Sequence, residues 1–232
     1  NRTYTLPQLY SYRTEGSAVL DNADSMLLLP DLLGYFLTGT KTTEMTIAGT
    51  SCLMENRQED WSLEVARRFG IPEKLYTEIV KPGTFKGTLR PEIQTQTGMK
   101  NTRLVATVGH DSAAAVAAIP DFGENKLYIS IGTNVSMGVE QAKCLLTREG
   151  YLKGFKNTGG IDRKKIIYRD FSACWHLNEF IRTRREQGVT YSFTDLINMA
   201  LEARNPVPWF DVEALTFNDA GGDFCKKMNQ YF

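Results

Sequence analysis

Apolar residues in the first seventy positions are spaced for short helices, and capping residues or prolines stand before several of them. A capping box at Thr5, with Gln three residues later, predicts the start of the first helix. Pro30 opens a second helix, which Gly39 ends. Two more helices are predicted within residues 44–49 and 60–70.

The next pattern is a strand, a tight turn and a helix in direct succession. The apolar run at residues 103–108 predicts a buried strand; Gly109, His110 and Asp111 follow it, and an alanine-rich helix then runs up to Pro120. Small side chains let that helix approach its neighbours closely. In α/β proteins ligands bind outside the carboxyl ends of strands, so this turn is the first candidate site.

The chain changes character at Asp121, where a polar break precedes two short apolar runs. These runs are rich in β-forming residues and meet at Gly132 and Thr133, which predicts a hairpin. We therefore place a domain boundary near residue 121, between a first part, residues 1–120, and a second part, residues 121–232.

Two further helices are predicted in the second part. Apolar residues spaced three and four positions apart begin at Phe171 and carry Asn178 within their stripe, so this amide is either satisfied in the core or faces a cleft. Asp170 precedes the helix and either caps it or meets a ligand. Ser192, with Asp195 three residues later, is predicted to cap the second helix.

Composition limits the kind of protein. Of the 232 residues 42% are hydrophobic, enough for a core, and 27 basic residues balance 27 acidic ones, which gives no electrostatic reason to expect nucleic acid or a membrane as partner. Four scattered cysteines and two histidines offer no metal site. The longest apolar stretch is too short to span a bilayer and no signal peptide is visible, so we expect a cytoplasmic protein. The chain begins without Met, and we expect both of its ends to be cut.

Charge is unevenly distributed along the chain. Eight basic residues lie between Gln141 and Arg169, against two acidic ones. They form either a solvated face or the basic edge of a phosphate-binding cleft.

Asp111 is suited to chemistry as well as to structure. A carboxylate in the first helical turn lies at the positive end of the helix dipole, which favours its charged form, and a charged carboxylate accepts a proton from a substrate hydroxyl. The alternative is that Asp111 only caps the helix. His110 either donates a hydrogen bond to the substrate or anchors the turn.

The turn at Gly132 and Thr133 is the second candidate. Its free backbone N–H groups and the Thr133 hydroxyl are suited to a nucleotide phosphate, and an ordinary β-turn has the same composition. The sequence contains neither a P-loop nor a dinucleotide-binding glycine loop, so phosphate binding here needs another architecture.

The order of several segments resembles that of the FGGY carbohydrate kinases. These segments are LLLPDLLGYFLTGTKTTEMTIAGT, DWSLEVARRFGIP, IVKPGTFKGTLRPE, VATVGHDSAAAVAAIP and YISIGTNVSMGVE. A later segment, FKNTGGIDRKKIIYRDFSACWHLNEF, is most similar to the rhamnulokinase members of that family. The resemblance implies an α/β protein with the two-domain actin/hexokinase/Hsp70 (ribonuclease H-like) fold, incomplete at both ends. Residues 1–120 would be the C-terminal part of the sugar-binding N-terminal domain, and residues 121–232 the N-terminal part of the nucleotide-binding C-terminal domain.

The resemblance also implies roles for single residues. Asp111 would be the catalytic general base, and His110 would contact the sugar substrate. Gly132 and Thr133 would bind a phosphate of the cofactor ATP. Mg²⁺ would be held with the nucleotide, and no metal ligand is assigned in this chain.

The chain departs from the pattern of the family at several positions, among them Asn134, where Trp is usual after Gly-Thr. Asp170 stands where Asn is typical and Asn178 where Gln is typical, and both are expected to face the nucleotide as ATP-binding residues. The implied reaction is ATP-dependent phosphorylation of a ketose. The departures leave open a catalytically silent sugar- or nucleotide-binding paralogue, and a phosphohydrolase on the same fold is a third hypothesis. The phosphate loop and the adenosine-binding segment of the family are missing from the sequence, so we expect these residues alone to be inactive.

Overall fold

The computed structural model describes residues 4–120, 127–132, 135–162, 164–204, 209–214, 217 and 222–232. The chain divides into two compact units. Unit 1 comprises Asn1–Tyr128 and Gly138–Tyr168, and unit 2 comprises Ile129–Met137 and Arg169–Phe232. A stretch beyond the expected boundary near residue 121 therefore groups with the first unit, and the assignment of family domains on either side of that boundary stays a prediction.

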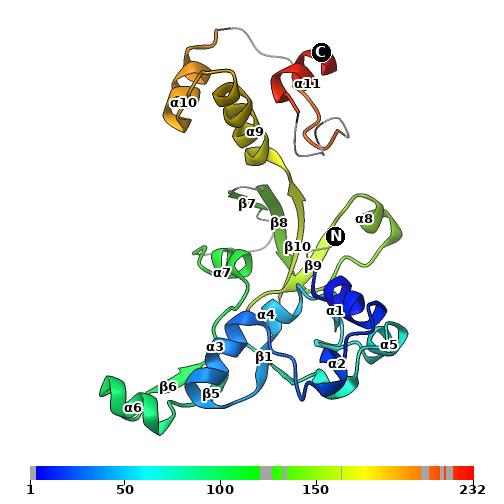
Figure 1. Cartoon of the computed structure of the whole chain (residues 1–232), viewed down its shortest axis with the longest axis vertical. Helices are drawn as coiled ribbons and strands as arrows, with labels where there is room; N and C mark the ends of the chain where they lie inside the picture. Colours follow the sequence, from blue (N-terminus) through cyan, green and yellow to red (C-terminus); the bar gives the residue numbers. More distant parts are fainter. Residues whose placement is uncertain are drawn as a thin grey trace. The chain divides into compact units, whose positions relative to one another are not determined.

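Unit 1 carries the helices predicted for the first seventy residues and several more (Figure 1). They are α1 (Thr5–Thr14), α2 (Val19–Asn22), α3 (Leu29–Thr38), α4 (Met45–Ala48), α5 (Leu63–Arg68), the 3₁₀-helix η1 (Glu73–Leu75), α6 (Pro91–Thr97), α7 (Asp111–Ala117) and α8 (Arg148–Leu152). The Ser62 hydroxyl caps α5 by accepting from the backbone N–H of Val65, and Gly39 ends α3 with a φ of 82°. The capping box predicted at Thr5 is wrong, because the cap position is Tyr4, whose side chain makes no capping hydrogen bond.

Small sheets connect these helices. β1 (Thr42–Glu44) pairs in parallel with β4 (Glu78–Val80), β2 (Met54–Glu55) antiparallel with β3 (Asp60–Trp61), and β5 (Phe85–Thr88) antiparallel with β6 (Arg103–Val105). The strand predicted at residues 103–108 is thus shorter than expected, and it is not buried, since Val105 is 48% exposed. Within the described residues β6 pairs with β5 alone, so no further strand covers its other edge.

A four-stranded sheet has the order β7–β8–β10–β9. Its strands are β7 (Leu127–Ile131), β8 (Val135–Gln141), β9 (Lys156–Gly159) and β10 (Lys165–Phe171), and β9 runs antiparallel to β10. β7 and β8 follow one another in the chain and are neighbours in the sheet, as the predicted hairpin requires. The division between the two units falls within β7, β8 and β10.

Three apolar clusters hold unit 1 together. The first contains Leu20 of α2 and Ala66 of α5, and α1 lies beside these two helices in Figure 1. The cluster that matters most for the site packs Ala113 of α7 against Tyr128 in β7 and Ile166 in β10. The small side chain of Ala113 brings α7 close to the sheet, as the sequence predicts, and this contact fixes the helix that begins at residue 111.

A buried ion pair links α3 to β5. The Asp31 and Lys86 side chains are only 2% and 5% exposed, and Lys86 Nζ lies 2.8 Å from Asp31 Oδ1. The same carboxylate oxygen accepts a hydrogen bond from the backbone N–H of Glu44 at 3.1 Å. A buried charge is tolerated when it is paired and hydrogen-bonded in this way.

Unit 2 is built mainly from helices. They are α9 (Ala173–Glu186), α10 (Phe193–Glu202) and α11 (Phe224–Tyr231). The capping box predicted at Ser192 and Asp195 is confirmed, with both of its hydrogen bonds present. His176 of α9 is buried among aromatic rings, and its ring centroid lies 5.7 Å from those of both Phe217 and Phe224.

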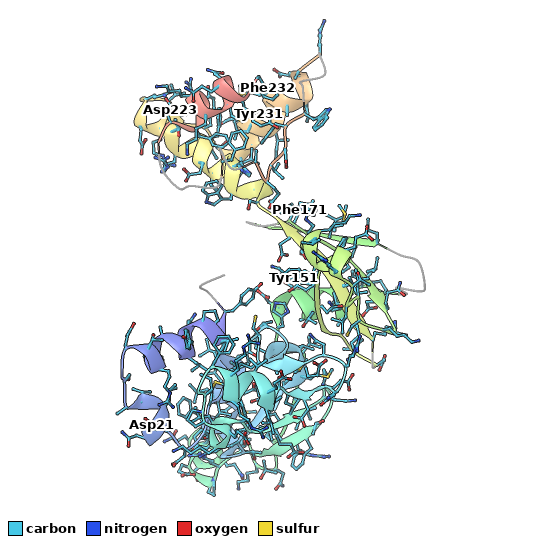
Figure 2. All side chains as sticks on the ribbon, turned by 90° about the vertical axis from the view of Figure 1, so that its right-hand side faces the viewer. Asp21, Tyr151, Phe171, Asp223, Tyr231 and Phe232 are labelled. Carbon is cyan, nitrogen blue, oxygen red and sulfur yellow. The ribbon has the colours of Figure 1, made fainter. Side chains whose placement is uncertain are left out.

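The helix predicted after Phe171 is confirmed, but the predicted apolar stripe along it is wrong at Asn178. Asn178 is exposed, so it is not a core amide. Ile181 does lie in the buried face, together with Thr183. Tyr231, labelled near the end of α11 in Figure 2, packs onto the same aromatic group of unit 2. In the part of the chain that the structure describes, no helix has both the length and the hydrophobicity needed to cross a bilayer.

Replacing Lys86 by Ala should lower the free energy of unfolding by about 3–5 kcal/mol, because it leaves the Asp31 carboxylate buried without its cation. The matched control is Lys153→Ala, since Lys153 is 62% exposed and pairs with Glu149 in α8. That loss should stay below about 1 kcal/mol. Urea unfolding followed by circular dichroism measures both, and equal losses would contradict a structural role for the buried pair.

Candidate active site

Asp111 is the first residue of α7, which Figure 1 shows beside β7. Its side chain is 96% exposed. Oδ1 accepts a hydrogen bond from the backbone N–H of Ser112 at 2.6 Å. The cap position of α7 is His110, whose side chain makes no capping hydrogen bond, so Asp111 does not serve as the N-cap. The carboxylate therefore stands at the start of the helix, open to a ligand.

His110 lies next to this carboxylate. Its Nε2 atom is 3.5 Å from Asp111 Oδ1, and its side chain is 19% exposed. The ring can therefore orient the carboxylate and still reach a ligand from one edge. The structure brings these two predicted site residues together, as their adjacency in sequence requires.

The turn that carries both residues is held by a buried carboxylate. Glu44, only 2% exposed, caps α4 by accepting hydrogen bonds from the backbone N–H groups of Thr46 and Ile47. Its Oε2 atom also accepts from the backbone N–H of Gly109 at 2.9 Å. The Thr46 hydroxyl donates to Glu44 Oε2 and accepts from the backbone N–H of His110 at 3.2 Å.

Glu44 and Thr46 are residues of the site that the sequence pattern did not reveal. The available signal is an acidic residue in front of a short predicted helix, and it indicates a local cap. The bond to Gly109 spans 65 positions, and only the fold brings the two residues together.

A small pocket of about 190 Å³ lies beside the turn, within unit 1. Its lining combines the charged side chains of Asp31, Glu44 and Lys86 with Gly109 and with apolar residues of α3 and β6. Asp31 Oδ2 is buried and has no hydrogen-bond partner among the described residues. This oxygen is a hydrogen-bond acceptor that the described side chains leave unused.

The other predicted site residues lie in unit 2. Gly132 follows β7 and is exposed, whereas Thr133 lies outside the described residues. Asp170 is half-buried in β10, and Asn178 is exposed on α9. Gly132 lies between β7 and β8 in the chain, and Asp170 lies in β10, the neighbour of β8 in the sheet. Among the described residues, no group of His, Cys, Asp or Glu side chains is arranged to hold a metal ion.

Lysines of the basic run pair with acidic residues. Lys153 pairs with Glu149, Lys164 with Glu140 and Lys165 with Glu59. Three members of the basic run therefore have acidic partners, and the basic edge of a phosphate-binding cleft stays a prediction. Lys165 is nearly buried, with 7% of its side chain exposed, so its pair with Glu59 ties β10 to the loop between β2 and β3.

Comparison with known proteins places these features in a family. The model of the FGGY family of carbohydrate kinases, N-terminal domain, matches residues 2–118. The chain is 35% identical to a rhamnulokinase of Bacteroides thetaiotaomicron over 196 residues, which cover 84% of this chain and 40% of the relative. It is 30% identical to a rhamnulokinase of Enterococcus faecalis over an alignment of 232 positions, which covers 97% of this chain and 46% of the relative. The chain thus spans less than half the length of these curated relatives.

Solved sugar kinases share the fold. The ligand-bound xylulose kinase from Lactobacillus acidophilus superposes with a TM-score of 0.71 at 14% identity, over 88% of this chain and 40% of that one. Plasmodium falciparum glycerol kinase with ADP gives a TM-score of 0.65 at 16% identity, over 79% and 38%. The expected actin/hexokinase-like fold is therefore confirmed, and the chain covers only part of it.

Hydrogen bonds from Lys165, and then from Lys81, hold the pKa of Glu59 below its ordinary value. A depressed folded-state pKa stabilises the protein above the ordinary pKa of a glutamate, about 4.3, and this contribution is lost as the pH falls through the lowered value. Lys165→Met should therefore destabilise the protein near neutral pH, and the difference from wild type should shrink as the pH falls below about 4.3.

Urea unfolding between pH 7 and about pH 3.5 measures this difference. Lys153→Met is the control, because it removes an exposed lysine that pairs with another acid. A difference between wild type and Lys165→Met that stays constant over the whole range would contradict the assignment of the stabilisation to Glu59.

Proposed function

Because the chain belongs to the FGGY family of carbohydrate kinases, we propose that the intact protein transfers the γ-phosphoryl group of ATP to a hydroxyl of a ketose, with Asp111 as general base. The observation that carries this proposal is the exposed Asp111 carboxylate at the start of α7, on a turn held by buried hydrogen bonds. The rhamnulokinases among its relatives favour L-rhamnulose as the first substrate to test.

In the proposed reaction the substrate hydroxyl oxygen attacks the γ-phosphorus, its proton passes to the Asp111 carboxylate, and ADP leaves. His110, 3.5 Å from that carboxylate, orients it and contacts the sugar. Mg²⁺, when bound with ATP, supplies charge neutralisation at the phosphate oxygens. Since no group of described side chains is arranged to hold a metal, we assign no protein ligand to the ion.

The nucleotide would be held by residues of unit 2. Gly132 and Thr133 would bind an ATP phosphate, and Asp170 and Asn178 would face the nucleotide. The exposure of Gly132 and of Asn178 supports these roles, since neither residue is taken up by the core. The departures at Asp170 and Asn178 make a silent paralogue an outcome that the assay has to test.

Asp111→Asn should lower kcat by about 10²–10⁴-fold, because the amide cannot take up the proton. The measurement is ADP release by the intact protein with ATP, Mg²⁺ and a panel of ketoses that includes L-rhamnulose. Asp24→Asn is the matched control, since Asp24 is an exposed aspartate after α2 in the same unit. It should keep the wild-type rate.

Each other result has a defined meaning. Equal turnover by wild type and Asp111→Asn would exclude Asp111 as the base. If neither wild type nor Asp111→Asn releases ADP although ATP still binds, the catalytically silent paralogue would be favoured. Phosphate release without any sugar would favour a phosphohydrolase.

We expect a protein of these 232 residues alone to show no kinase turnover, because the chain spans 40% to 46% of the length of relatives that carry the name rhamnulokinase. Purified chain of this length, assayed for sugar-dependent ADP release beside an intact relative, tests this expectation. Turnover that depends on the sugar would show that the residues present are sufficient.

A further inference from the structure

A buried carboxylate and a buried hydroxyl hold the turn that carries Asp111. We propose that Glu44 and Thr46 are positioning residues for the reaction, acting on Asp111 through the backbone of Gly109 and His110. The proposal deepens the proposed function and rests on it for its catalytic part.

Glu44 makes more hydrogen bonds than a helix cap requires. The first turn of α4 needs acceptors for its N–H groups, and the bonds from Thr46 and Ile47 supply them. The bond from Gly109 comes from a distant segment and does nothing for α4. A buried carboxylate has capacity for further donors, and here that capacity fixes the turn.

Thr46 holds the next residue of the turn, His110. Its hydroxyl donates to Glu44, which leaves its oxygen lone pairs directed to the backbone N–H of His110. Two successive peptide N–H groups are therefore held by two buried side chains, those of the N-cap of α4 and of a residue in its first turn. Asp111 is the next residue, so these two bonds restrain the backbone that leads directly into it.

The approach leaves little room for a side chain at position 109. A Cβ atom built there would lie 3.0 Å from Glu44 Oε2 and 3.3 Å from Ile47 Cγ2. A larger residue would push the turn away from the carboxylate and lengthen the bond that holds it. Proximity, and not an unusual backbone angle, explains the glycine.

Further hydrogen bonds restrain Glu44 and Thr46 themselves. The backbone N–H of Glu44 donates to Asp31, which pairs with Lys86. On the other side, the Thr158 hydroxyl of β9 donates to the carbonyl of Thr46 at 3.4 Å. Residues on both sides of α4 thus restrain the two side chains that hold the turn, which is the arrangement a rigid catalytic group needs.

Replacement of Thr46 by Val tests the proposal, because Val keeps the shape and removes the hydroxyl. Thr46→Ser keeps the hydroxyl and serves as the rescue variant. Thr43→Val is the control: Thr43 is equally buried, at 0% exposed, but its hydroxyl bonds to Thr77 and not to the turn.

Two measurements on the intact protein separate positioning from general stability. Hydrogen exchange of the Gly109 and His110 amides should quicken by about tenfold in Thr46→Val and stay near wild type in Thr46→Ser and Thr43→Val. The kcat of Thr46→Val should fall by about 10²-fold with little change in KM for ATP, and Thr46→Ser should restore it.

Unchanged exchange at both amides in Thr46→Val would overturn the proposal, whatever the activity. Faster exchange with an unchanged kcat would also overturn it, because the turn would then be held without consequence for Asp111. An equal fall of kcat in Thr43→Val would show a general loss of stability and not positioning. If the wild type has no kinase activity, the proposed function fails, and the exchange data still decide whether these residues hold the turn.

Discussion

A carboxylate that is buried away from water needs hydrogen-bond donors from the protein. The donors to Glu44 come from two segments that are far apart in sequence. The N–H groups of α4 are local to it, while the N–H of Gly109 is brought to it by the fold. Because the cost of an unpaired buried charge is high, this requirement fixes where the turn before α7 can lie. The position of Asp111 is thus a consequence of how the protein solvates Glu44.

The supporting carboxylate of Glu44 and the proposed general base have opposite surroundings. Glu44 is 2% exposed and fully bonded, whereas the side chain of Asp111, two residues after the bonded glycine, is 96% exposed. A rigid buried support beneath an exposed carboxylate is the arrangement that catalysis by positioning requires, since the backbone that carries the carboxylate loses little entropy when a substrate arrives. Unit 2 is held differently, by aromatic rings packed around His176, whereas Gly132 and Asn178 of that unit are exposed.

Local patterns in the sequence predicted local structure well. The helix that ends at Gly39, the helix within residues 60–70 and the capping box at Ser192 depend on neighbours in sequence, and the structure has them where the patterns indicate. The strand at residues 103–108 was predicted to be buried because its residues are apolar, but burial depends on which strands lie beside it, and β6 has one partner in the described residues. The predictions of Asp111 and His110 came from a turn that sequence reveals. The bond from Glu44 to Gly109 joins positions that share no pattern, so only the folded chain discloses it.

The central claim is that the turn held by Glu44 presents Asp111 to the hydroxyl that is phosphorylated. A crystal structure of the intact protein with L-rhamnulose and a non-hydrolysable ATP analogue tests it most directly. The account predicts an acceptor hydroxyl within about 2.6–3.2 Å of an Asp111 carboxylate oxygen, with the Gly109 N–H still bonded to Glu44. A sugar bound with every hydroxyl out of reach of Asp111, or a turn released from Glu44 in the complex, would contradict it.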